Sequence, residues 1–234
     1  MKLCVTPKFW VYGLVPRFTH ITFDCYGTLI DWRAGIDSYL GGLLRRKGLP
    51  PEVSVHPIYV KSEAEQEGKY KSYSRVLHDT AISVAKSFNL SISGDEAQEF
   101  AGTIQDWKAF DDTVESLRAL GERGYKRIIL SNIDRGLLQK TISHNHLEVD
   151  GCITAEDVGS YKPSLGHWNR FFDEYKVSKG ETLHVAQSIY HDIIPATKIG
   201  IANAWINRYR EEKPAEIKPT WITPDLAGLL KILD

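Results

Sequence analysis

Short apolar runs and helical spacings alternate along most of the chain. The segment THITFDCYGTL, residues 19–29, is apolar and rich in β-branched residues, and it breaks at Gly27. It therefore predicts a buried strand that ends in a turn. Similar short runs predict strands at 127–130, 151–154, 183–186 and 202–206, the last being the final strand expected. Helical spacing predicts intervening helices at 112–123, 137–142, 168–175 and 195–199.

Between the first two predicted strands the spacing is almost entirely helical. Residues 35–46 form one expected helix, which Pro50 and Pro51 bring to an end. Helical patterns return over 57–87 and from 95 to about 107. We therefore expect a helical domain over residues 35–107, inserted into an α/β core made of residues 1–34 and 108–234. Strands alternating with helices predict an open, parallel, Rossmann-like sheet in that core.

Composition narrows the classes of partner. The 234 residues are 42% hydrophobic and 25% charged, with a formal net charge of -1, which is ordinary for a globular protein. Because the charges are balanced and produce no strongly positive or negative surface potential, we expect a small-molecule substrate and neither nucleic acid nor a membrane as partner. A homodimer stays open. Residues 1–17 are interrupted by Pro7 and Lys8, so we predict a non-native start or a strand-like arm instead of a signal peptide.

The cysteines are few and odd in number. Cys4, Cys25 and Cys152 form neither a disulfide framework nor a zinc-binding pair. A reducing compartment, the cytoplasm, is the simpler expectation. Cys25 lies beside a candidate site residue, so it is either a reactive thiol or a small buried side chain, and we favour burial.

Polar side chains stand where the predicted strands end. Ligands of open α/β sheets bind outside the carboxyl ends of the strands, and these ends hold Asp24, Ser131 with Asn132, Lys162, and the run from Ser188 to Asp192. A carboxylate in such a place can attack an electrophile and form an ester. Lysine can keep that carboxylate ionised, and a second carboxylate can orient the lysine, activate water or hold a metal.

Smaller groups complete this expected site. Thr28 offers a hydroxyl and an amide just after the turn at Gly27. Ser131 and Asn132 precede a predicted helix, so their side chains and the free amides there predict an anion pocket. Ser131 can also cap that helix. His191, a lone histidine next to Asp192, is more typical of a packing or surface residue than of a base.

The ordered segments FDCYGTL, LSN, SYKP and SIYHD resemble the four motifs of the haloacid dehalogenase (HAD) superfamily. Each is weak alone, but together they span nearly the whole chain, each at a strand end. The helical insertion falls where that family carries its cap. The resemblance implies a hydrolase with Asp24 as covalent nucleophile.

The residue two places after Asp24 distinguishes branches of the superfamily. Phosphatases usually have a second aspartate there, whereas this chain has Tyr26, which resembles the L-2-haloacid dehalogenase branch. That resemblance implies hydrolytic dehalogenation of a small 2-halo acid without a cofactor. It implies that the catalytic residues are Asp24, Lys162 and Asp192. It also implies a set of substrate-binding residues, namely Tyr26, Thr28, Ser131, Asn132 and Ser188.

Two other functions stay open. One is a Mg²⁺-dependent phosphatase of small metabolites, with the metal held by Asp24, the Tyr26 carbonyl and Asp192. The other is a catalytically silent binding member.

The chain also departs from the dehalogenase branch. Residues 50–68 lack the arginine of the branch, Trp168 replaces a tyrosine, and the run 187–191 lacks an asparagine. In the same cap segment Glu63, Glu65 and Glu67 predict a solvated helix face. If they faced the pocket instead, they would repel a carboxylate substrate.

Overall fold

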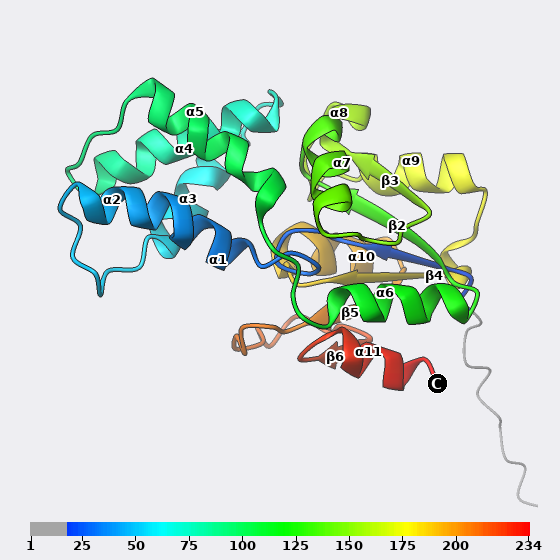
Figure 1. Ribbon diagram of the computed structural model, residues 1–234. Helices are drawn as coiled ribbons and strands as arrows, with labels where there is room; N and C mark the ends of the chain where they lie inside the picture. Colours follow the sequence, from blue (N-terminus) through cyan, green and yellow to red (C-terminus); the bar gives the residue numbers. More distant parts are fainter. Residues whose placement is uncertain (1–17) are drawn as a thin grey trace, which may run out of the picture.

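The core of the protein is one parallel sheet. The computed structural model describes residues 18–234, so Cys4 and the predicted arm over residues 1–17 lie outside the described residues. Six strands follow the order β3-β2-β1-β4-β5-β6 (Figure 1). Their bounds are β1 His20–Phe23, β2 Lys126–Ser131, β3 Gly151–Thr154, β4 Thr182–Ala186, β5 Ala202–Ile206 and β6 Trp221–Thr223. The predicted Rossmann-like sheet is confirmed, with β1 at its centre.

One strand was not predicted. We expected β5 to be the last, but β6 pairs with it in parallel, with Trp205 opposite Ile222. This strand has only three residues and lies at the edge of the sheet. So short a segment shows no periodicity, and only its pairing identifies it.

Apolar side chains from alternate positions of the strands cover both faces of the sheet. On β2, Ile129 packs in one cluster with residues of α6 (Thr113–Glu122) and α11 (Leu226–Ile232). Its neighbours Ile128 and Leu130 pack in another, with residues of α9 (Gly166–Tyr175) and α10 (Ile194–Lys198). Figure 1 shows α6 and α11 side by side on one face. Burial on both faces explains why the strands read as continuous apolar runs.

The segment between β1 and β2 is helical, as predicted. This helical insertion comprises α1 Trp32–Ile36, a π-helical turn η1 Asp37–Gly41, α2 Gly42–Arg46, α3 His56–Gln66, α4 Tyr73–Ser87, α5 Gly94–Thr103 and a 3-10 turn η2 Ile104–Asp106. The pattern over 57–87 predicted one helical stretch, but the chain breaks it between α3 and α4, at residues 67–72. Figure 1 shows α1 to α5 gathered at one end of the sheet.

Hydrogen bonds fix this insertion over the carboxyl ends of the strands. Asp134, which precedes α7 (Arg135–His144), accepts from the backbone N–H groups of Tyr73 and Ser74 at 2.7 and 2.9 Å. Tyr161, beyond α8 (Ala155–Val158), donates its hydroxyl to the Lys71 carbonyl at 2.6 Å. The core thereby caps the N-terminus of α4 and holds the loop before it.

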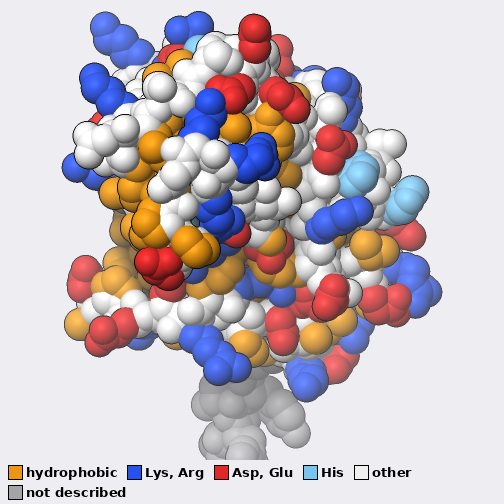
Figure 2. Space-filling model, turned by 60° about the vertical axis from the view of Figure 1, so that its left-hand side comes forward, with side chains coloured by type: hydrophobic (Ala, Val, Ile, Leu, Met, Phe, Trp, Pro, Cys, Tyr) orange, Lys and Arg blue, Asp and Glu red, His pale blue; other side chains and the backbone are white. Residues whose placement is uncertain are grey.

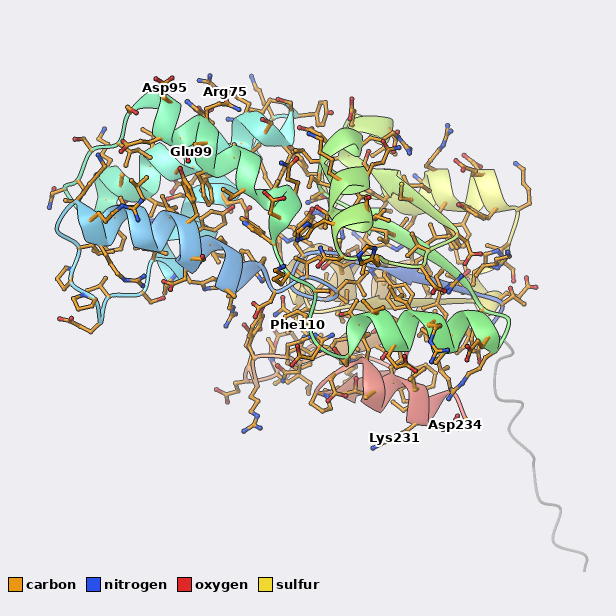
Figure 3. All side chains as sticks on the ribbon, in the orientation of Figure 1. Arg75, Asp95, Glu99, Phe110, Lys231 and Asp234 are labelled. Carbon is orange, nitrogen blue, oxygen red and sulfur yellow. The ribbon has the colours of Figure 1, made fainter. Side chains whose placement is uncertain are left out.

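The outer surfaces show ordinary mixed polarity. Arg75, Asp95 and Glu99 of the insertion are exposed, and Arg75 and Asp95 project from its upper edge in Figure 3. In the face seen in Figure 2, acidic and basic side chains are interspersed with apolar ones. Within residues 18–234, no helix has the length and apolar character needed to cross a membrane.

Candidate active site

Asp24 stands at the tip of the central strand. Its backbone N–H continues the β1–β4 pairing by donating to the Val185 carbonyl at 3.0 Å. The chain then turns at Gly27, whose φ of +95° is a conformation that L side chains rarely adopt. A Cβ atom there would lie 3.0 Å from Trp32 Nε1. Glycine is therefore required both by the backbone and by the close approach of Trp32.

Lys162 joins two carboxylates beneath this turn. Its ammonium donates to Asp24 Oδ1 at 2.9 Å, to Asp192 Oδ1 at 2.7 Å and to the Leu130 carbonyl at 2.8 Å. These three acceptors use all three protons of the group. Lys162 and Asp192 are only 1% and 0% exposed. The structure thus brings together the three side chains that the sequence predicted as catalytic, and buries their charges as one network.

Thr28 holds Asp24 from the other side. Its hydroxyl donates to Asp24 Oδ2 at 2.8 Å and accepts from the Gln187 backbone N–H at 2.9 Å. Thr28 is fully buried and is not among the residues that line the cavity described below. We predicted it as a substrate-binding residue; that placement is wrong, because its side chain is committed to orienting Asp24.

His184 is a member of the network that sequence reasoning missed. Its Nε2 lies 3.0 Å from Asp192 Oδ1 and its Nδ1 lies 2.8 Å from the Thr22 hydroxyl. An ionised carboxylate only accepts, so Nε2 donates, and in the neutral ring Nδ1 accepts from Thr22. His184 lies within an apolar strand, where the sequence gives no sign of a polar partner.

The network divides charge unequally between its carboxylates. Burial opposes ionisation of Asp192, but the Lys162 ammonium and the hydrogen bond from His184 outweigh it and lower its pKa to about 2. For Asp24, burial and the negative charge of Asp192 outweigh Lys162 and Thr28, so its pKa is raised. Burial likewise opposes the charge on Lys162, yet the two carboxylates raise its pKa to about 12.

A cavity of about 600 Å³ opens over Asp24, between the sheet and the insertion. Its lining includes four of the predicted substrate-binding residues, Tyr26, Ser131, Asn132 and Ser188. Their side chains are not equally available. Ser131 is 1% exposed, and its hydroxyl has no hydrogen-bond partner within the described part of the chain. Ser131 does not cap α7, whose N-cap residue is Asp134.

The other three of these side chains already have partners. The Asn132 amide exchanges hydrogen bonds with the backbone of Lys162, at 2.6 and 3.1 Å. The Ser188 hydroxyl accepts from the His191 N–H at 3.1 Å and begins the π-helical turn η4, Ile189–Ile193. The Tyr26 hydroxyl lies 2.8 Å from Thr141 Oγ1. Asn132 and Ser188 therefore shape the loops that carry the network.

The insertion contributes acids to the cavity wall. Glu63, on α3, and Glu67, which follows its last residue, line the cavity, and of the three glutamates only Glu65 is exposed. The prediction of a solvated helix face is therefore wrong for Glu63 and Glu67, because one side of α3 faces the sheet. His191, predicted as a packing or surface residue, also lines the cavity, with Nε2 3.5 Å from Glu67 Oε2.

Arg33 is a cavity residue that sequence reasoning missed. It lies on α1, its Nη2 donates to Glu211 at 2.5 Å, and its guanidinium stacks 3.4 Å from the centre of the Tyr209 ring. It stands outside the segment in which we looked for an arginine, residues 50–68. Only the folded chain shows that α1 reaches the cavity.

Cys25 follows Asp24 but is fully buried. Burial, followed by the charge of Asp24, raises the pKa of its thiol well above the usual range. The thiol is therefore protonated and has no access to solvent, which agrees with the favoured prediction of a buried small side chain.

Known proteins resemble this chain in sequence and in fold. Curated (S)-2-haloacid dehalogenase 1 of Pseudomonas sp. (strain CBS-3) is 23% identical in an alignment of 205 positions that covers 84% of this chain and 88% of that protein. The L-2-haloacid dehalogenase from Xanthobacter autotrophicus, solved with chloropropionic acid covalently bound, superposes with a TM-score of 0.80 at 18% identity, over 92% of this chain and 98% of that one.

A third similar protein was solved with a metal. A HAD hydrolase from Bacillus subtilis bound to magnesium has a TM-score of 0.76 at 20% identity and covers 93% of this chain and 99% of its own. At such identities, the two structures show a shared fold. The family is settled by the match of residues 18–200 to the model of haloacid dehalogenase-like hydrolases, which spans most of the chain. This protein belongs to the haloacid dehalogenase-like hydrolases.

Proposed function

We propose that this hydrolase uses Asp24 as a nucleophile and passes through a covalent ester. In the first step an Asp24 oxygen bonds to an electrophilic carbon of the substrate while a halide leaves with the bonding electron pair. Water then hydrolyses the ester. The observation that supports this most is the placement of Lys162 between Asp24 and Asp192, at the floor of a cavity large enough for a small molecule.

A small 2-halo acid is the substrate that we propose, with the helical insertion as the cap over it. The similar dehalogenases named above motivate this choice. Two groups in the cavity wall also favour a carboxylate: Arg33 Nε and Ser131 Oγ, both buried and without a partner among residues 18–234. Glu63 and Glu67 disfavour a carboxylate substrate, because two ionised glutamates in the cavity wall would repel it and weaken its binding.

A Mg²⁺-dependent phosphatase is the second candidate, and one observation favours it. Asp192 Oδ2 is buried and has no hydrogen-bond partner in the described part of the chain, and Mg²⁺ prefers oxygen ligands. Asp24, Asp192 and the Tyr26 carbonyl would hold the ion, which would neutralise a phosphoryl group. Tyr26 is a poor donor to the leaving group, because burial raises the pKa of its phenol well above the usual range.

The nucleophile is tested with oxygen-18 water. We expect a single turnover with excess enzyme to place the label in the Asp24 carboxyl, because water attacks the ester carbonyl, and to leave the product alcohol unlabelled. Asp24→Asn should abolish turnover. Asp95→Asn, on the outer face of the insertion (Figure 3), is the matched control and should retain it.

Substrate class is tested in parallel. Chloride release from L-2-chloropropionate that a chelator leaves unchanged would support the dehalogenase. Phosphate release from an aryl phosphate that requires Mg²⁺ would support the phosphatase. With the halo acid as substrate, label in the product alcohol with none in Asp24 would refute the nucleophile, and full activity of Asp24→Asn on either substrate would refute it for both. No turnover on either substrate class would favour the silent binding member.

A further inference from the structure

Hydrolysis of an Asp24 ester requires a proton donor. Water adds to the Asp24 carboxyl carbon, and the bond between that carbon and the alcohol oxygen breaks. The electron pair goes to the alcohol oxygen, which must gain a proton to leave as the alcohol. Water thereby supplies one oxygen to Asp24 and two protons in total. One replaces the proton that the donor gave, and the other is released to solvent, where it balances the charge of the halide set free in the first step.

The side chains nearest to Asp24 are poor donors for this step. Lys162 already directs all three of its protons to Asp24, Asp192 and the Leu130 carbonyl. The Tyr26 hydroxyl is paired with Thr141, 2.8 Å away. Asp192 has lost its proton at any neutral pH, since its pKa is about 2. The donor must therefore come from elsewhere in the cavity wall.

The histidines of the wall do not meet the need either. His56 is a poor donor at neutral pH, because burial, aided by the charge of Arg33, lowers its pKa to about 4 and leaves the ring without its acidic proton. His191 uses Nδ1 beside the Ser188 hydroxyl at 3.2 Å and Nε2 towards Glu67 at 3.5 Å. The same contact occupies the carboxylate of Glu67, so Glu67 is not a free donor either.

Glu63 differs from these groups in how it is held. The hydroxyls of Tyr59 and Tyr73 both donate to its Oε1, at 3.1 and 2.5 Å. Tyr59 is buried on α3, and Tyr73 begins α4, so the carboxyl is fixed from two helices. With Oε1 accepting twice, Oε2 is the oxygen that can bear an acid proton. Glu63 and Asp24 line the same cavity, Glu63 from α3 of the insertion and Asp24 from the end of β1.

From this arrangement, and resting on the proposed ester mechanism, we propose that Glu63 is the acid that protonates the leaving alcohol when the Asp24 ester is hydrolysed. Glu63 then regains a proton from the water that was consumed. The proposal gives the helical insertion a chemical part in the reaction.

The surroundings of Glu63 suit an acid at neutral pH. Burial, followed by the negative charge of Glu67, raises its pKa to about 7, against the lowering effects of Tyr73, His191 and Tyr59. These groups face it from α3, α4 and η4. A donor works best when its pKa lies near the working pH.

Halide release and ester hydrolysis are measured separately in Glu63→Gln. Glutamine still accepts from both tyrosines but has no proton to give. We expect halide release in the first turnover at the wild-type rate, followed by ester hydrolysis slowed by about 10²- to 10⁴-fold, so that the Asp24 ester accumulates. The alkaline decline of wild-type hydrolysis near pH 7 should vanish. Glu65→Gln, exposed on the same helix, should match the wild type.

Tyr73→Phe provides an independent readout. The hydrogen bond from Tyr73 lowers the pKa of Glu63, so its loss should move the alkaline limb to higher pH. A Glu63→Gln enzyme that hydrolyses the ester at the wild-type rate and keeps the limb would overturn the proposal. An alkaline limb at the same pH in Tyr73→Phe as in the wild type would also overturn the proposal. If the wild type formed no Asp24 ester, the proposed function itself would fail, which is a distinct result.

Discussion

Replacing Lys162 by methionine tests the charge network directly. The change keeps most of the side-chain length but removes the ammonium that faces two buried carboxylates. Removing one partner of a buried ion pair costs about 3–5 kcal/mol, because the remaining charge is left without compensation. We expect the free energy of unfolding at pH 7 to fall by about that amount in Lys162→Met.

The loss should also depend on pH. Without Lys162, two carboxylates face each other in a buried site, so one folded-state pKa rises further above its unfolded value of about 4. Between those values the folded state binds the extra proton, so the free energy of unfolding falls as pH rises through the raised pKa. The variant should therefore lose less relative to wild type at pH 5 than at pH 7.

Urea unfolding at both pH values measures these differences. Lys126→Met is the matched control, because Lys126 pairs with Asp150 at 3.2 Å while 60% exposed, and such surface pairs contribute about 0–1 kcal/mol. Adding Asp192→Asn to Lys162→Met should recover part of the stability. Equal losses for the two lysine variants, or a Lys162→Met loss unchanged between pH 7 and pH 5, would refute the reasoning.

Two further substitutions test the frame around the site. Gly27→Ala should lower stability by about 1–3 kcal/mol, because alanine is strained at φ +95° and its Cβ would lie 3.0 Å from Trp32; thermal unfolding and turnover measure it, and an unchanged Tm would contradict it. Asp134→Ala removes both acceptors for the N–H groups of Tyr73 and Ser74 and should cost about 0.5–2 kcal/mol. Limited proteolysis between α3 and α4 should accelerate, and an unchanged cleavage rate would argue against this anchor.

The sequence was sufficient for the parts of the site that parallel topology determines. Strands buried on both faces read as continuous apolar runs, so their ends were visible, and the carboxyl ends of parallel strands meet at one edge. Asp24, Lys162 and Asp192 were therefore expected together, and their side chains are in contact. The division of the chain into a core domain and a separate helical domain over residues 35–107 stays a prediction.

Other residues were hidden because their role depends on what the fold places beside them. His184 reads as part of an apolar strand, and its contact with Asp192 spans eight positions that turn back at η4. The charged spacing of Glu63 to Glu67 is the same whether α3 faces water or the sheet. What decides is the packing of α3 against α4, with Tyr59 and Tyr73 turned towards Glu63.

The unequal surroundings of the two carboxylates explain why Asp24 and not Asp192 is the nucleophile that we propose. Asp192 receives the shorter contact with Lys162 and a second donor in His184, and its side chain is 1% exposed. Its charge is therefore fixed and inaccessible. Asp24 has a raised pKa and an 11% exposed side chain that opens to the cavity. A more basic carboxylate gives up its electron pair more readily, so one lysine both secures Asp192 as a permanent charge and leaves Asp24 able to react.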